Sequence, residues 1–328
     1  MKETPQHNLG LDLARVTEAA ALASARWMGK GDKEQGDKAA VDAMRVSFDS
    51  VDIRGTVVIG EGEKDKAPML FNGEKVGSGR GPETDVAVDP VEGTRLLAYG
   101  RPNAIAVVSM APKGSMYDPG PAFYMNKLVA PAEAKGQLDI KAPVADNLAK
   151  TAKALGKDID DLMVFVLDKE RHQGLIREIR AAGARIQLHT DGDVAGALMA
   201  VMPGTGVDLM MGTGGTPEGV LAATAIRIMG GEMQSMLDPQ SEEEKGGVLS
   251  AGYNLEQILT AEELVTSDDV FFAATGITGG SFLKGVEFTG RNARTFSMIM
   301  RGRTGTIRYM EACHTFETLM QISAIQYD

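Results

Sequence analysis

The chain has 328 residues, of which 43% are hydrophobic and 24% are charged, so it can bury the core of one large domain or of two closely packed ones. Its formal net charge of −11 argues against a general nucleic-acid-binding protein, because such proteins need a positively charged surface. A single cysteine excludes a disulfide framework within the chain, and one cysteine with four histidines argues against a zinc site.

The start of the chain, Met1 to Asn8, is polar and lacks the apolar core of a secretory signal. No run of about 18 apolar residues occurs in the sequence, which is the length that a membrane-spanning helix needs. We therefore expect a soluble protein of the cytoplasm that has no membrane partner.

Two helices are predicted at the start of the chain. Apolar residues recur at three- and four-residue steps over residues 9–28 and again over 37–48. Asp32 lies in the loop between them, and Asp37 lies at the start of the second helix. Helix capping is one explanation for either aspartate.

Two apolar segments then end in acidic residues. Residues 56–60 form a β-type run that leads into Glu61 and Glu63, and residues 85–94 begin as a strand whose side chains alternate between two faces. We expect Pro90 to stop the strand and to fix a turn that brings Asp89, Glu92 and Thr94 together. Asp-Pro and Glu-Gly are also ordinary turn pairs. Two strand ends that each supply a carboxylate pair nevertheless favour a site for Mg²⁺ or Mn²⁺, which prefer oxygen ligands.

The middle of the chain is less regular. Residues 73–81 contain four glycines and predict a flexible loop or hairpin, whereas residues 104–110 predict a strand buried on both faces. Residues 117–127 are predicted as a loop, in which Tyr124 and Lys127 are the informative side chains. A change in composition near residue 142 predicts two halves, residues 1–142 with most metal ligands and residues 143–328 with substrate-binding loops.

The second half alternates strands with helices, which predicts a parallel sheet. The expected strands are 162–167, 185–189 and 207–211, and the expected helices are 145–155, a segment ending near 182, 193–202 and a segment ending near 228. Ligands bind beyond the carboxyl ends of such strands. Those ends carry Lys169 with Arg171, Asp191 with Asp193, and Glu218. Residues 235–255 are predicted as a solvated irregular segment, followed by strands at 270–276, 295–300 and 305–310.

The acidic motifs resemble those of a known enzyme family. Ile-Gly-Glu-Gly-Glu at 59–63, Ala-Pro-Met-Leu at 67–70 and Asp-Pro-Val-Glu-Gly-Thr at 89–94 are similar to motifs of the class II fructose-1,6-bisphosphatases. These enzymes belong to the lithium-sensitive, metal-dependent sugar phosphatases, a superfamily that includes the inositol monophosphatases. The resemblance implies a mixed α/β fold, namely a layered α-β-α-β-α sandwich, and an oligomer that is a homodimer or a homotetramer.

The resemblance also implies a set of site residues. The implied metal ligands, for Mn²⁺ or Mg²⁺, are Asp37, Glu61, Asp89, Glu92 and Glu218. The implied substrate contacts are Glu92, Gly93, Thr94, Tyr124, Lys169, Glu170, Arg171, Asp191, Gly192, Asp193 and Gly215. The family often has proline where this chain has Glu170, and a carboxylate next to two phosphate-binding cations leaves the role of Glu170 open.

The expected chemistry is metal-assisted hydrolysis of a phosphate ester, because an acidic pocket can hold an anionic ester only with cations between them. Thr94 is the candidate for orienting the attacking water, and Glu63 is its candidate carboxylate partner. The expected reaction converts fructose 1,6-bisphosphate to fructose 6-phosphate and phosphate in gluconeogenesis. Dual action on sedoheptulose bisphosphate is a near alternative. A non-catalytic sugar-phosphate sensor would not need the acids, and a nucleotide-dependent oxidoreductase would need a glycine motif that the first strand lacks.

Overall fold

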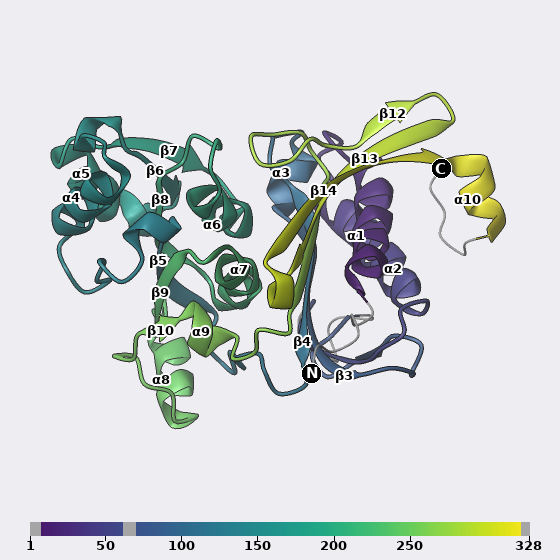
Figure 1. The fold of residues 1–328 in the computed structure, drawn as a ribbon, viewed down its shortest axis with the longest axis horizontal. Helices are drawn as coiled ribbons and strands as arrows, with labels where there is room; N and C mark the ends of the chain where they lie inside the picture. Colours follow the sequence, from purple (N-terminus) through teal and green to yellow (C-terminus); the bar gives the residue numbers. More distant parts are fainter. Residues whose placement is uncertain (1–7, 62–69, 323–328) are drawn as a thin grey trace.

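The computed structural model describes residues 8–61 and 70–322, and its helices and sheets form five layers (Figure 1). One pair of helices covers the outer face of a six-stranded sheet, a second pair lies between the two sheets, and a third pair covers the outer face of an eight-stranded sheet. In that order the pairs are α4 (Val144–Leu155) with α5 (Gln173–Ala181), α6 (Asp193–Val201) with α7 (Thr216–Met229), and α1 (Gly10–Ala25) with α2 (Lys33–Phe48). The layered sandwich predicted from the sequence is confirmed.

The eight-stranded sheet mixes parallel and antiparallel neighbours. Its order is β12-β13-β11-β4-β3-β1-β2, with β14 paired to β13. Only β1 and β3 run parallel, so their carboxyl ends lie at the same edge. The bounds are β1 (Arg54–Ile59), β2 (Lys75–Val76), β3 (Glu83–Glu92), β4 (Ile105–Pro112), β11 (Phe271–Gly276), β12 (Glu287–Thr289), β13 (Asn292–Arg301) and β14 (Thr306–Thr315).

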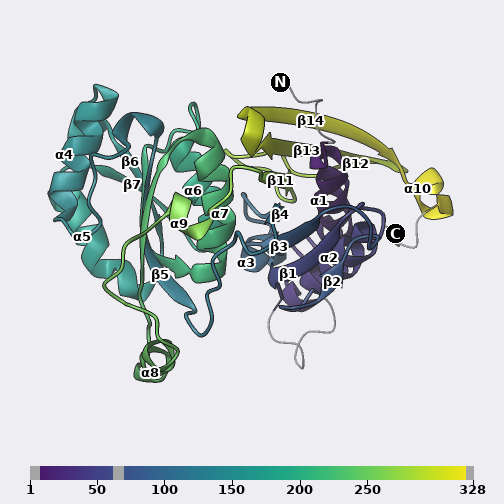
Figure 2. The ribbon, with the colours of Figure 1, turned by 60° about the horizontal axis from the view of Figure 1, so that its bottom comes forward.

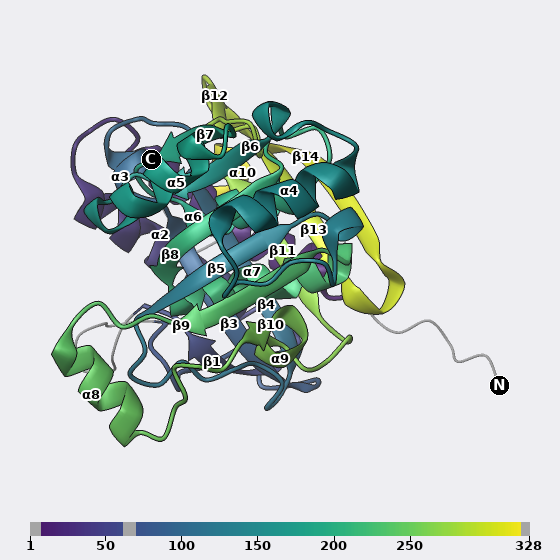
Figure 3. The same cartoon turned by 90° about the vertical axis from the view of Figure 1, so that its left-hand side faces the viewer.

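The six-stranded sheet has the order β10-β9-β5-β8-β6-β7. The predicted parallel portion is present, because β6 pairs in parallel with both β7 and β8. Figure 3 shows this sheet behind α4. The bounds are β5 (Tyr124–Ala130), β6 (Met163–Leu167), β7 (Arg185–His189), β8 (Leu209–Gly215), β9 (Glu232–Leu237) and β10 (Leu259–Thr260).

The middle helices α6 and α7 are apolar around most of their circumference, which is typical of a helix buried on all sides. They pack against both sheets in a core that includes Ala87, Met125, Phe165 and Val220. Val86 and Val88, on the opposite face of β3, pack instead in the core beneath α1 and α2. The predicted alternation of side chains along β3 is therefore confirmed, and it turns Asp89 toward the middle layer.

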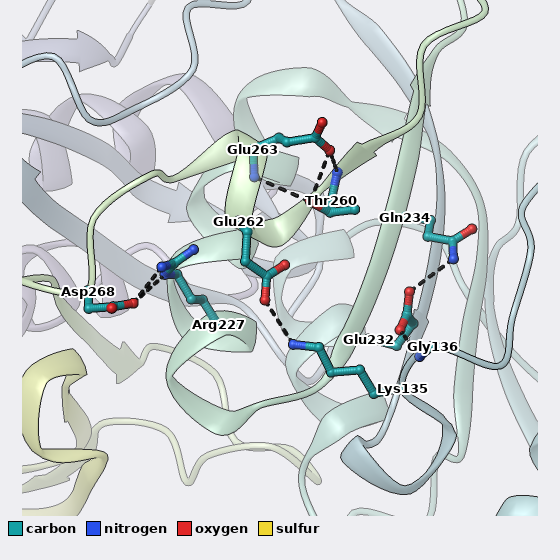
Figure 4. A network of polar contacts seen from close by, with 9 residues as sticks. All are labelled: Lys135, Gly136, Arg227, Glu232, Gln234, Thr260, Glu262, Glu263 and Asp268. Atoms are coloured by element: carbon teal, nitrogen blue, oxygen red, sulfur yellow. Dashed lines mark hydrogen bonds and ion pairs between the residues drawn. The ribbon is translucent and has the colours of Figure 1, made fainter.

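Short elements complete the fold. The helices are α3 (Thr94–Ala98), α8 (Glu242–Ser250), α9 (Ala261–Leu264) and α10 (Phe316–Ile322), and the 3₁₀ turns are η1 (Ala132–Ala134), η2 (Ile159–Asp161), η3 (Glu170–His172) and η4 (Gly302–Thr304). Thr260 and Glu263 form a capping box at the start of α9, where the chain leaves the six-stranded sheet. The ion pairs Lys135–Glu262 and Arg227–Asp268 hold the same stretch (Figure 4). None of the helices in the described ranges is long and apolar enough to span a membrane.

Two predictions of local structure are wrong. The strand does not stop at Pro90, because β3 continues to Glu92 and absorbs the proline in a bulge between Asp89 and Glu92. The loop predicted at 117–127 ends earlier, because β5 begins at Tyr124 and contains Lys127. The last pair between β1 and β3 joins Ile59 to Ala87, and Pro90 lies beyond it. The N–H that proline lacks is therefore not needed for pairing with β1.

The prediction of an irregular segment at 235–255 is also wrong. β9 occupies its start, and α8 follows with its N-terminus capped by the side chain of Ser241. Figure 2 and Figure 3 both show α8 standing away from the two sheets. Most of its side chains are exposed, so the polar composition that predicted a loop reflects a solvated helix.

The chain passes between the sheets twice. β5 lies before residue 142 but belongs to the six-stranded sheet, and β11 to β14 lie after it but belong to the eight-stranded sheet. The sheets therefore do not follow the predicted boundary, and a division into domains 1–142 and 143–328 stays a prediction.

A glycine substitution tests the packing of the middle layer. A Cβ at Gly196 of α6 would lie 2.3 Å from the buried ring of Phe165, so Gly196→Ala forces the helix away from β6. We expect a loss of about 1–3 kcal/mol in the free energy of unfolding, measured by urea denaturation. Gly174→Ala in α5 is the matched control, because nothing lies within 4 Å of its Cβ. It should leave stability unchanged or raise it by up to about 1 kcal/mol. Equal effects of the two substitutions would contradict this packing.

Candidate active site

A cavity of about 300 Å³ lies between the edge of the eight-stranded sheet and the first turns of the middle helices. Seven acidic residues line it, and the described lining contains no lysine, arginine or histidine. The acids are Asp37, Glu61, Asp89, Glu92, Asp191, Asp193 and Glu218. All five residues predicted as metal ligands are among these acids. The predicted substrate contacts Gly93 and Thr94 also line the cavity.

The two parallel strands supply the first group of carboxylates. Glu61 follows the end of β1, and Asp89 and Glu92 lie at the carboxyl end of β3. The bulge at Pro90 lets both β3 side chains reach the cavity, and Asp89 Oδ1 accepts the Val91 N–H at 3.1 Å. Gly93 adopts a left-handed conformation with φ of 91°, which ends the strand and starts α3 at Thr94.

The helices supply the rest. Asp37 lies in the second turn of α2, whose N-terminus is capped by Asp32, so capping does not explain Asp37. Asp193 is the first residue of α6 and Glu218 lies in the first turn of α7. The N-termini of α6 and α7 therefore both meet the cavity, where their dipoles favour negative charge. The Val194 N–H of α6 donates to Glu92 Oε1 at 3.2 Å.

Glycines make room for two of these carboxylates. A Cβ at Gly214 would lie 1.9 Å from Asp193 Oδ2, and a Cβ at Gly215 would lie 1.8 Å from Glu218 Oε2. No other residue fits either position without moving a carboxylate. The requirement explains the Gly-Gly pair at the end of β8 and gives Gly215, a predicted substrate contact, a definite role in shaping the cavity.

Crowding and burial make the carboxylates unusually basic. Burial and the nearby charges of Asp37 and Glu218 raise the pKa of Glu61 to about 8, and burial raises the pKa of Asp37 to about 6. Burial and the other cavity acids raise the pKa values of Asp89 and Glu92 well above the ordinary range. A cation nearby lowers the pKa of each carboxyl group and so favours its ionised form at neutral pH.

Two buried oxygens point to where that cation binds. Glu92 Oε2 and Glu218 Oε2 are fully buried and have no hydrogen-bond partner in the described structure. An unpaired carboxylate oxygen is costly to bury, and hard divalent cations coordinate such oxygens. The donor set, made of carboxylate oxygens only, fits Mn²⁺ or Mg²⁺ and does not fit zinc, which prefers nitrogen and sulfur.

The cavity acids surround a space and do not converge on one point. Within the described residues, only Asp158, Asp160 and Asp161 bring three ligand oxygens within 4.8 Å of one another. All three are exposed at η2, on the six-stranded sheet, and exposed acidic groups are common without an ion. The ligand oxygens of the cavity acids are therefore spaced more widely than those of this exposed group.

One buried cation stands behind the cavity. Lys127 of β5 is 2% exposed, and its Nζ lies 2.5 Å from Asp193 Oδ2. Burial and Asp193 raise the pKa of Glu218 to about 7, and the positive charge of Lys127 opposes this rise. Lys127 was one of the two informative side chains of the 117–127 segment but was not predicted as a site residue. The available signal was a lysine directly before the apolar run Leu128-Val129-Ala130, where a buried ammonium requires a charged partner.

The remaining predicted contacts lie beside the cavity. Tyr124 is paired with Gly215 across β5 and β8, and the guanidinium of Arg171 lies 5.0 Å from the centre of the Tyr124 ring. Lys169 and Glu170 belong to the same turn after β6, where Lys169 is half-buried and Glu170 is exposed. Gly192 lies against Glu92 at the start of α6. Glu63, the predicted partner of Thr94, lies outside the described residues.

The chain is similar to known proteins along nearly its whole length. The family profile described as "Bacterial fructose-1,6-bisphosphatase, glpX-encoded" matches residues 7–314. A D-fructose 1,6-bisphosphatase class 2/sedoheptulose 1,7-bisphosphatase 2 of Acaryochloris marina is 43% identical, over 97% of this chain and 98% of the relative. A protein of Thermosynechococcus vestitus, also named for both activities, is 42% identical over 97% and 98%. Fructose-1,6-bisphosphatase 1 class 2 of Escherichia coli is 42% identical over 94% and 96%.

The raised pKa values predict how stability depends on pH. The folded pKa of Glu61 is about 8 and that of Glu218 is about 7, against an ordinary value of 4.5, so the folded protein binds more protons than the unfolded chain. The free energy of unfolding should therefore fall as pH rises through 7 and 8. We expect the Tm of chelator-treated protein to drop from pH 5.5 to 8.5, and Mn²⁺ to restore it at pH 8.5.

Two variants serve as controls for this experiment. Glu61→Gln should make the drop shallower, because it removes one buried charge, whereas Asp158→Asn in the exposed acidic group should leave the slope unchanged. A chelator-treated protein that is as stable at pH 8.5 as at pH 5.5 would contradict the electrostatic description of the cavity.

The Lys127–Asp193 pair gives a second prediction. Lys127→Met leaves the Asp193 carboxylate buried without its cation, and we expect a loss of about 3–5 kcal/mol in the free energy of unfolding. The double variant Lys127→Met with Asp193→Asn removes both charges and should recover most of that loss. Urea denaturation at pH 7.5 measures both. A double variant that is no more stable than Lys127→Met would show that the ion pair is not the cause.

Proposed function

The chain belongs to the family of bacterial class II fructose-1,6-bisphosphatases, and from this premise we propose that it hydrolyses fructose 1,6-bisphosphate to fructose 6-phosphate and phosphate. It is then a phosphoric monoester hydrolase that serves gluconeogenesis. The observation that carries the proposal is the acidic cavity, which holds two buried carboxylate oxygens that have no partner among the described residues. Such a cavity admits a phosphate ester only together with cations.

The proposed cation is Mn²⁺ or Mg²⁺, held by Asp37, Glu61, Asp89, Glu92 and Glu218. When bound, such cations neutralise phosphate oxygens and lower the pKa of an attacking water. The N-termini of α6 and α7 add a fixed positive potential at the same place. Because the carboxylates come from separate strands and helices, the fold fixes their positions before any substrate arrives.

The half-buried Thr94 begins α3 beside Glu92, and we propose that it orients the attacking water. The carboxylates Asp191 and Asp193 cannot bind phosphate directly, so they accept hydrogen bonds from sugar hydroxyls. Asp193 is held for this role by Lys127. Lys169, Arg171 and Tyr124 lie outside the acidic cavity, and we propose that they bind the phosphate group that is not cleaved.

The relatives named for two activities motivate a second substrate. The proteins of A. marina and T. vestitus are named as sedoheptulose bisphosphatases as well as fructose bisphosphatases. The shared requirement is a sugar with a phosphate at each end, and we propose that this chain accepts both sugars with different efficiency. A sugar-phosphate sensor without catalysis is disfavoured, because it would not need the buried acids.

The remaining assignments are proposals of the same kind. We propose an enzyme of the cytoplasm that works as a homodimer or homotetramer and binds neither nucleic acid nor membrane. The net charge of −11 supports the absence of a nucleic-acid partner.

Phosphate release by the purified protein tests the function. With Mn²⁺ or Mg²⁺ present, we expect release from fructose 1,6-bisphosphate, and chelation should abolish it. Glu218→Gln removes a cavity carboxylate and should lower kcat/KM by roughly 100-fold or more, whereas the exposed control Asp158→Asn should keep full activity. Parallel assays with sedoheptulose 1,7-bisphosphate measure the second substrate. Activity that survives exhaustive chelation would overturn the metal-dependent mechanism.

A further inference from the structure

His172 is a buried side chain whose two ring nitrogens are both used. It is 3% exposed, its Nε2 lies 2.8 Å from the backbone nitrogen of Thr213, and its Nδ1 lies 2.7 Å from the Leu167 carbonyl oxygen. The Thr213 nitrogen can only donate, so Nε2 must accept, and Nδ1 must carry the proton that it donates to Leu167. The neighbours therefore fix one neutral tautomer of this ring.

The preceding residue contacts the same threonine. Arg171 donates from Nε at 3.1 Å and from Nη2 at 2.8 Å to the Thr213 carbonyl oxygen. His172 and Arg171 thus satisfy the N–H and the C=O of a single residue of β8. In the described structure, Nη1 of Arg171 makes no hydrogen bond and is therefore available to an anion.

These contacts complete an edge that a strand leaves open. The last pair between β6 and β8 joins Phe165 to Met210, yet β8 continues to Gly215. Beyond that pair, Thr213 has polar backbone groups that a longer β6 would have paired. Side chains of η3 take the place of the missing strand, so the Lys169–Arg171 turn is docked on β8 by His172 and Arg171.

Thr213 also links this turn to Tyr124. Its Oγ1 donates to Asp238 Oδ2 at 2.6 Å, and the backbone N–H of Asp238 donates to the Tyr124 carbonyl at 2.9 Å. Glu244 of α8 holds the start of the same strand, because its Oε1 accepts the N–H groups of Phe123 and Tyr124. A shift of Thr213 would therefore separate Arg171 from Tyr124.

We propose that His172 is a positioning residue for binding of the phosphate that is not cleaved. It fixes Thr213, and through Thr213 it places Arg171 and Tyr124 relative to the acidic cavity. The inference rests on the proposed function. It assigns His172 an effect on affinity for a sugar bisphosphate and none on the binding of the divalent cation or on the reaction at the cavity.

Two variants separate the two ring contacts. His172→Asn keeps a donor near Leu167 and loses the acceptor for Thr213, whereas His172→Gln keeps an acceptor at the distance of Nε2 and loses the donor. We expect His172→Asn to raise KM for fructose 1,6-bisphosphate roughly tenfold, because a buried N–H is left unpaired. We expect kcat to stay within about threefold. His172→Gln should stay within about threefold of the wild type in both constants.

Three further measurements distinguish positioning from a purely structural role. The Mn²⁺ concentration that half-maximally raises Tm should not change in His172→Asn, and kcat/KM for p-nitrophenyl phosphate, which has no second phosphate, should not change either. In an Arg171→Gln background, His172→Asn should raise KM by a smaller factor than it does alone, because part of its effect acts through Arg171. His314→Asn, the same substitution at a histidine of β14 that contacts Thr295, is the matched control and should leave KM unchanged.

The outcomes decide between the proposals. A wild-type protein that fails to hydrolyse the bisphosphate refutes the proposed function itself. An active wild type whose His172→Asn variant loses Tm but keeps its KM refutes only the positioning role. If His172→Asn does not fold, His172→Gln still decides, because a tenfold rise in its KM would show that the Thr213 contact is not the acting one.

Discussion

The structure depends on a concentration of buried negative charge that the polypeptide itself only partly compensates. Seven carboxylates from α2, β3, α6, α7 and the turns that follow β1 and β7 surround one small cavity. Within the described residues, the chain offers them the buried ammonium of Lys127, backbone N–H groups on Asp89 and Glu92, and two helix N-termini. The deficit is met by protons or by bound cations, and this explains how an acidic protein can bind a substrate that is itself a polyanion.

The other polar cluster of the site has the opposite sign and a different construction. Arg171 and Lys169 stand on a 3₁₀ turn at the end of β6, separated from the acidic cavity by the last residues of β8. The separation is useful, because guanidinium groups inside the cavity would pair with the carboxylates and displace the cations. In the proposed function, one phosphate is bound through metal and the other directly, and β8 sets the distance between them.

Local sequence patterns predicted much of this arrangement because the two key strands end in acids. The β1 end at Glu61 and the β3 end at Asp89 and Glu92 were readable from strand composition, and the parallel sheet of the second half followed from its alternation of strands and helices. The resemblance supplied Asp37 and Gly215. The bulge at Pro90 was missed, because proline usually ends a strand and only the register with β4 shows that it does not.

Other features depend on contacts between distant segments and have no local signal. Lys127 and Asp193 are 66 positions apart, and the sequence around each residue does not indicate its partner. The polar run that becomes α8 was predicted as a loop, because a helix with only two buried residues, Glu244 and Val248, has little amphipathic pattern. The role of His172 has no local signal either, because the contacts on both ring nitrogens appear only once β6 and β8 are aligned.

The path of the chain between the sheets has a consequence for how the protein is made. β4 lies at the centre of the eight-stranded sheet. Its neighbour β11, which pairs Phe271 with Met110, is far from it in the sequence. During synthesis the ribosome completes the six-stranded sheet while one side of β4 still lacks its neighbour. The first half of the nascent chain must therefore wait with an apolar strand edge exposed, which invites aggregation and favours slow, late assembly of the catalytic cavity.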